Sequence, residues 1–169
     1  MDSLPMDTKS LRAFLLFVLI FPIVSFAETR LDLHKMMKNA GKYPASAELR
    51  KQMAAESDIH AALLRCNADK RWDINDIEEF FAAARIDVGL KGTTTYLVFP
   101  TKYCPEFFGA HTVPFWLMRR AHDGTYETLF SDATDEIRIL DTRSHRYRDI
   151  SLKYGFDDPV VYRFDGEGY

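Results

Sequence analysis

The sequence lacks the short motifs that mark several common enzyme classes. It contains no GxSxG turn, no HExxH pair, no GxGxxG fingerprint and no phosphate-binding P-loop, so the usual signatures of hydrolases, zinc proteases and nucleotide-binding enzymes are missing. An excess of positive charge is also missing, because the net charge is −3, whereas a nucleic-acid binder needs a basic surface. We therefore expect no nucleic-acid partner, no metal and no other cofactor.

Long apolar runs are scarce as well. The most apolar stretch runs from Ala13 to Val24 and is interrupted by Pro22, which leaves it short of the roughly 20 residues that span a membrane. Two basic residues, Lys9 and Arg12, precede it, and Ser25-Phe26-Ala27 follows it. A basic start, a short apolar centre and small residues at the −3 and −1 positions are typical of a signal peptide rather than a membrane anchor.

The sequence thus predicts a signal peptide over residues 1–27, with cleavage after Ala27. The mature chain is expected to span 28–169 as a single domain, to be periplasmic or secreted, and to keep no stable membrane anchor. Hydrophobic residues make up 47% of the chain and aromatic residues 14%, which is enough to build a folded core.

Cysteine is rare, with only Cys66 and Cys104 in the sequence. In an oxidising compartment two cysteines pair most simply as one disulfide. Such a bridge closes a long loop and is worth roughly 4 kcal/mol by the chain-entropy argument. The alternative is a catalytic thiol at Cys104, paired with His111 of the same loop. Export favours the disulfide.

The hydrophobic period changes from helical to alternating near Ile86, which predicts an α+β fold. N-terminal helices, over 28–86, are expected to pack on a C-terminal antiparallel β-meander of five or six strands, over 94–166. The expected helices are 31–39, a helix from Ala47 that is interrupted near Ser57-Asp58, and a third whose buried stripe contains Ile77, Phe80, Phe81 and Ala84. The expected strands are 94–99, 113–121, 126–130, 136–141, 147–154 and 160–164, with a hairpin turn at Asp123-Gly124 and another turn over 143–146.

The loop 100–112 is the best candidate for partner binding. It holds Tyr103, Phe107, Phe108 and His111 next to the predicted disulfide. Aromatic side chains on a covalently fixed loop bind a partner at low entropic cost. The alternative is that Phe107 and Phe108 cap the end of the core.

The C-terminal part carries a resemblance. It contains Tyr147-Arg148-Asp149-Ile150 and then a run from Val161 that ends in Phe164-Asp165-Gly166-Glu167-Gly168-Tyr169. This resembles small Sec-exported proteins of Gram-negative bacteria, in which a helical part precedes a meander ending in aromatic-Asp-Gly-x-x-Tyr, often with a cysteine pair. The resemblance implies a periplasmic location and a fold in which a helical part precedes a β-meander. Most such proteins have no assigned activity, and some of similar build act as immunity proteins or inhibitors.

The function expected from these features is non-enzymatic binding of a protein partner, with the chain serving as an immunity or inhibitor protein that acts by surface contact on a cell-wall-directed enzyme. One alternative is an envelope hydrolase with an unrecognised site, which would show a buried acid or histidine with a perturbed pKa in a deep cleft. The other is a small-ligand-binding or structural envelope protein, which would show an apolar pocket between helices and sheet.

Overall fold

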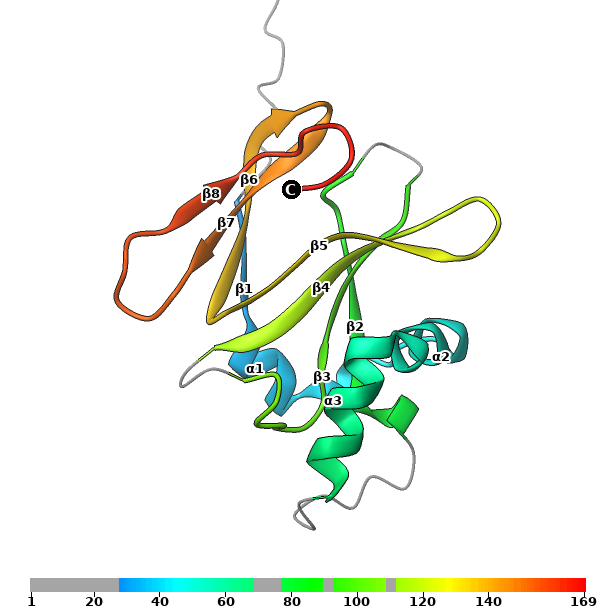
Figure 1. The fold of residues 1–169 in the computed structure, drawn as a ribbon. Coiled ribbons are helices and arrows are strands. Elements are labelled where there is room, and N and C mark those ends of the chain that lie inside the picture. The colour runs from blue at the N-terminus through cyan, green and yellow to red at the C-terminus, as the bar shows by residue number, and fades with distance from the viewer. Residues whose placement is uncertain (1–27, 69–76, 90–92, 109–111) are drawn as a thin grey trace, which may run out of the picture.

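The computed structural model describes residues 28–68, 77–89, 93–108 and 112–169 (Figure 1). These residues form three α-helices and eight strands, arranged in two four-stranded antiparallel sheets. The chain is therefore an α+β protein, as the sequence predicts. The predicted signal peptide, residues 1–27, and the candidate contact His111 lie outside the described residues.

The central sheet has the strand order β2-β3-β4-β5. Its strands are β2 (Phe81–Ile86), β3 (Thr95–Pro100), β4 (Val113–Arg120) and β5 (Tyr126–Thr134). Both faces of this sheet are buried. In β3, Leu97 and Phe99 pack against the other sheet, while Val98 between them packs against the helices. Burial on both faces explains why this strand is apolar at consecutive positions from Tyr96 to Pro100 rather than at alternate ones.

The outer sheet has the order β1-β6-β7-β8. Its strands are β1 (Thr29–Asp32), β6 (Glu136–Ser144), β7 (Tyr147–Lys153) and β8 (Val160–Tyr162). The chain bends sharply from β5 into β6 and so passes from one sheet to the other (Figure 1). Ile139 of β6 and Leu152 of β7 contribute to the core that the two sheets share. This core is the larger of two buried clusters.

The helices α2 (Ala47–Ala55) and α3 (Ser57–Ala68) cover the other face of the central sheet. The hydroxyl of Ser46 accepts a hydrogen bond from the Leu49 N–H at 3.2 Å and so caps α2. Leu49, Met53 and Leu63 are buried against the sheet and form the second cluster. The break between the two helices falls at Glu56, next to the predicted interruption. The short helix α1 (Leu33–Lys38) instead packs against the shared core through Leu33 and Met36.

The predicted third helix is wrong. Residues Ile77–Phe80 form a single 3₁₀ turn, and the chain then continues as β2, which pairs along its whole length with β3. Phe81 and Ala83 face the helices, whereas Ala82 and Ala84 face the outer sheet. A short run that is apolar at every position suits a helix or a doubly buried strand equally well. Pairing with β3 decides in favour of the strand.

The predicted single meander of five or six strands is also corrected, because the described residues contain eight strands in two sheets. All six predicted strands are present. The additional ones, β1 and β2, lie in the part of the chain predicted to be helical, and β1 pairs with β6. The predicted turn over 143–146 narrows to His145 and Arg146, which both have positive φ, of 47° and 72°. The predicted hairpin is confirmed at Gly124, whose φ is 91°.

Candidate functional site

The predicted disulfide between Cys66 and Cys104 is present, with the two Cα atoms 5.8 Å apart. Cys66 comes from α3 and Cys104 from the loop that leaves β3, and both side chains are buried. The bridge therefore ties the helical layer to the end of the central sheet, as the sequence predicts. We call residues 101–108 the stapled loop.

Hydrogen bonds and an ion pair hold the stapled loop in addition to the disulfide. At its start, the Thr101 N–H donates to the Phe80 carbonyl at 2.8 Å. Further on, the N–H groups of Phe107 and Phe108 both donate to the Cys104 carbonyl, at 3.0 and 3.2 Å. The Arg65 guanidinium of α3 contacts the Glu106 carboxylate at 2.6 Å. The loop backbone is thus fixed at several points before any partner arrives.

The aromatic side chains of the stapled loop have different environments. Phe107 is half-buried and stacks on Phe80, with ring centroids 5.7 Å apart. Phe108 is half-buried and packs against both hydrophobic clusters. Tyr103 is 55% exposed, with its ring centroid 4.7 Å from that of Phe108. Phe107 and Phe108 therefore pack towards the core, and Tyr103 is the aromatic side chain of the loop that is exposed to solvent.

Leu64 is another exposed apolar side chain. It lies on α3, two residues before Cys66, and is 49% exposed. Leu63 and Leu64 are consecutive apolar residues within the interrupted helical spacing that starts at Ala47. Two consecutive helical residues point about 100° apart, however, and Leu63 takes the buried position. Helical geometry was therefore the signal that could have identified Leu64 as exposed.

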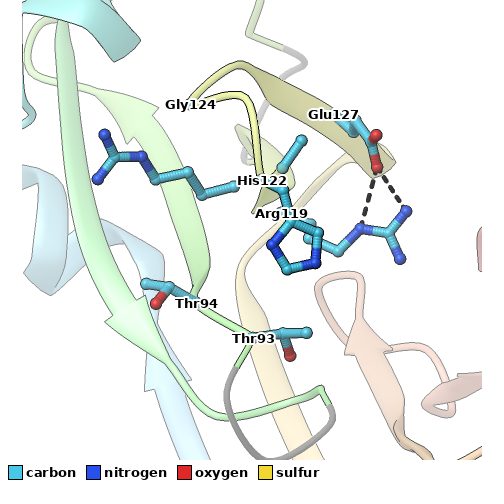
Figure 2. Close-up of a pocket in the computed structure, with 8 residues that line it drawn as sticks. Thr93, Thr94, Arg119, His122, Gly124 and Glu127 are labelled. Atoms are coloured by element: carbon cyan, nitrogen blue, oxygen red, sulfur yellow. Dashed lines mark hydrogen bonds and ion pairs between the residues drawn. The ribbon is translucent and has the colours of Figure 1, made fainter.

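An open pocket of about 560 Å³ lies beside the β4–β5 hairpin (Figure 2). Its lining includes Thr93, Arg119, His122 and Glu127. Figure 2 shows the Arg119 guanidinium turned towards Glu127. Its Nε donates a hydrogen bond to the Glu127 carboxylate at 3.0 Å, and its Nη1 donates one to the Tyr147 hydroxyl at 3.0 Å. The hydrogen bonds to Glu127 and Tyr147 raise the pKa of Arg119, which keeps the guanidinium charged.

The chemistry of this pocket is that of a charged surface rather than of an acid–base site. Glu127 neutralises the charge of Arg119. Within the described residues, the exposed His122 has no hydrogen bond to a nucleophile or to a carboxylate that could orient it. A general base needs such a partner within hydrogen-bond reach. The pocket therefore offers weak support for catalysis and leaves the stapled loop as the better candidate for function.

The described part of the chain contains neither a metal-ligand cluster nor a helix that could span a membrane. No group of three or more His, Cys, Asp or Glu side chains in these residues could hold a metal ion. None of the helices within the same ranges is long and apolar enough to cross a membrane.

Comparisons with known proteins leave the family of this chain open. No protein-family model, no curated protein and no solved structure matches it. Function therefore has to be inferred from the surfaces that the fold presents, above all from the stapled loop.

Proposed function

We propose that this chain is a non-enzymatic, extracytoplasmic binding protein that acts by surface contact on a protein partner. In this proposal the partner is a cell-wall-directed enzyme, and the chain serves as its inhibitor or immunity protein. The observation that carries the proposal is the exposed Tyr103, held on a loop that is fixed by the Cys66–Cys104 disulfide.

The physical reason is pre-organisation. A tyrosine offers a large contact area with few rotatable bonds, and such aromatic anchors dominate the free energy of many protein interfaces. Binding usually pays for ordering a loop, at about 0.5–1.5 kcal/mol for each side chain that is immobilised. Here the Tyr103 ring already packs against the Phe108 ring, and the disulfide already ties the loop to α3. Little conformational freedom is left to lose.

The same bridge supports the compartment in this proposal. Disulfides persist in the periplasm and outside the cell and are rare in reducing compartments. A buried Cys66–Cys104 bridge joining two layers of the fold is therefore consistent with an exported protein. The basic and apolar segment before Ala27 supplies the means of export in this proposal, and the periplasm is the expected destination.

The test is affinity capture from an envelope extract, with protein expressed from the full sequence as bait. We expect one stoichiometric enzyme partner that loses activity when bound. Tyr103→Ala should raise the dissociation constant by about tenfold or more, as expected for an anchor worth at least ~1.4 kcal/mol. Phe156→Ala is the matched control, because Phe156 is also an exposed aromatic but lies on the β7–β8 hairpin. Equal affinity for all variants would refute the role of the stapled loop.

A further inference from the structure

Both edges of the central sheet are partly covered by other parts of the chain. Along β2, the Ala83 N–H donates to the Tyr43 carbonyl at 2.9 Å, and Pro44 forms an isolated bridge with Ala82. Along β5, the side chain of Gln52 bonds both the N–H and the carbonyl of Tyr126. Proteins commonly protect free strand edges in this way, because an uncovered edge is a template for pairing with another strand.

The edges of the outer sheet differ from each other. Strand β1 carries charged side chains, with Arg30 paired to Glu136 and Asp32 paired to Lys35, and charge discourages pairing at an edge. Strand β8 pairs with β7, and its backbone has no hydrogen bond to any other described residue on its second side. It presents apolar side chains instead, since Val160 and Val161 are 45% and 49% exposed and Phe156 before them is fully exposed.

The hairpin that carries β8 is firmly held. Tyr154 donates a hydrogen bond to the Asp132 carboxylate at 2.7 Å, and its hydroxyl lies 3.2 Å from that of Tyr162. The Gly155 N–H donates to the Asp135 carboxylate at 2.7 Å. Burial, together with the hydrogen bonds to Tyr162 and Asp132, raises the pKa of Tyr154, so its phenol remains a donor. The exposed valines are thus displayed on a fixed edge.

We propose that β8 pairs with β8 of a second copy of this chain, in antiparallel orientation, and joins two outer sheets into one continuous eight-stranded sheet. Charge is the reason for choosing a second copy. Asp157 and Asp158 precede the strand and Arg163 follows it, and all three are exposed. In an antiparallel pair the acidic start of each strand lies beside the basic end of the other. The same complementarity arises twice about the two-fold axis, as in an isologous dimer.

The apolar centre and the charged ends have separate roles in this interface. Val160 buries apolar surface on one face of the joined sheet and Val161 on the other, and the strand edges satisfy each other's backbone groups, which supplies affinity. The contacts of Arg163 with Asp157 and Asp158 of the second copy fix the direction and register. A parallel pairing would instead bring like charges together at each end. The inference concerns self-association and is independent of the partner proposed for the stapled loop.

Sedimentation equilibrium of protein expressed from the full sequence tests this inference. We expect a reversible monomer–dimer equilibrium in the wild type. Val161→Lys and Arg163→Asp should each weaken the dimer by about tenfold or more, the first by placing charge on the strand edge and the second by placing like charges together. The double variant Asp157→Arg, Asp158→Arg should weaken it in the same way.

Mixing the variants separates pairing through β8 from any other mode of association. Arg163→Asp alone and the double variant alone are each repulsive, but together each acidic end meets a basic end, so an equimolar mixture should form a heterodimer. Failure of the mixture to associate would overturn the proposal, and so would a wild type that stays monomeric at every concentration. A wild type that stays monomeric would indicate that β8 pairs with a strand of another protein. Tyr103→Ala should leave the dimer unchanged, which keeps this test apart from that of the partner.

Discussion

The phenol of Tyr169 donates a hydrogen bond to the backbone carbonyl of Arg148, 2.5 Å away. Its ring also packs against Phe130 of β5 and against Phe164. The C-terminal residue therefore connects a strand of the central sheet with a strand of the outer sheet. Burial raises the pKa of Tyr169, and the nearby Asp149 carboxylate raises it further. The phenol therefore stays protonated and able to donate.

The aromatic-Asp-Gly-x-x-Tyr sequence has a structural explanation in this tail. The Asp165 carboxylate accepts hydrogen bonds from the N–H groups of Glu167 and Gly168, both at 2.9 Å, and Gly166 provides a φ of 121°. These features turn the chain back, so that the Tyr169 N–H reaches the Leu129 carbonyl at 3.1 Å. The motif thus places Tyr169 where it contacts both sheets.

Gly168→Ala should destabilise the protein. A Cβ at this position would lie 2.8 Å from the Leu129 carbonyl oxygen, which the Tyr169 N–H holds in place. We expect a loss of about 1–3 kcal/mol in the free energy of unfolding, as for other overpacked sites. Gly41→Ala is the control, because nothing lies within 4 Å of a Cβ there. Urea unfolding measures both, and equal stability of the two variants would contradict the tail's role.

Arg148→Met should also be costly, because Arg148 satisfies an irregular part of β6. The register of β6 against β7 shifts between Ile139 and Arg143. The buried Arg148 guanidinium donates to the carbonyls of Leu140 at 2.7 Å and Ile139 at 3.1 Å. Methionine would leave these acceptors unpaired, at a cost of roughly 2–3 kcal/mol. The same change at the exposed Arg85 of β2 should shift the thermal unfolding midpoint far less, and matching shifts would count against this explanation.

Removing the disulfide should lower stability without changing the fold. The double variant Cys66→Ala, Cys104→Ala loses a link across 38 residues of sequence, and we expect it to unfold with about 2–4 kcal/mol less free energy. Wild-type protein treated with a thiol reductant should give the same urea unfolding curve as the double variant. A reductant that leaves the wild-type curve unchanged would show that the bridge is not formed in solution.

Part of the acid sensitivity of this protein should come from Glu136. Burial acts to raise its pKa, but hydrogen bonds from Arg138, at 2.7 Å, and from Arg30 outweigh this and lower the pKa below its ordinary value of 4.5. A pKa lowered by folding adds stability above the ordinary value, and this contribution is lost as the pH falls through the folded-state value. Glu136→Gln should therefore be less stable than wild type at pH 7, by a margin that shrinks below about pH 4.5. Unfolding midpoints measured across this range test it, and a constant margin would contradict it.

The strands that could be predicted from sequence are those with local signals. The alternation in 147–154 and the Asp123-Gly124 turn both identify antiparallel pairs formed by neighbouring segments, and the structure confirms them. Strand β1 has no such signal, because its partner β6 lies more than a hundred residues away, as in the pairing of Leu31 with Ile137. Strand β2 was mistaken for a helix because burial on both faces removes the alternation.

The candidate site was predictable to a similar extent. The pairing of Cys66 with Cys104 follows from their number and the expected compartment, and the structure confirms it. The aromatic residues of the loop differ in exposure, because Phe107 is half-buried and Tyr103 is exposed. This difference depends on tertiary contacts, since the Phe107 ring packs against Phe80 and Trp116. Spacing within a loop has no fixed period, so sequence alone could not assign these environments.

The most direct measurement of the central claim is the affinity of the captured partner for wild type, Tyr103→Ala and Phe156→Ala, by titration calorimetry. We expect Tyr103→Ala to weaken binding by about tenfold or more, since an exposed aromatic anchor is lost, and Phe156→Ala to bind like wild type. Thermal unfolding of each variant checks that the fold is kept. Unchanged binding by Tyr103→Ala in a folded protein would contradict the claim that this protein recognises its partner through the stapled loop.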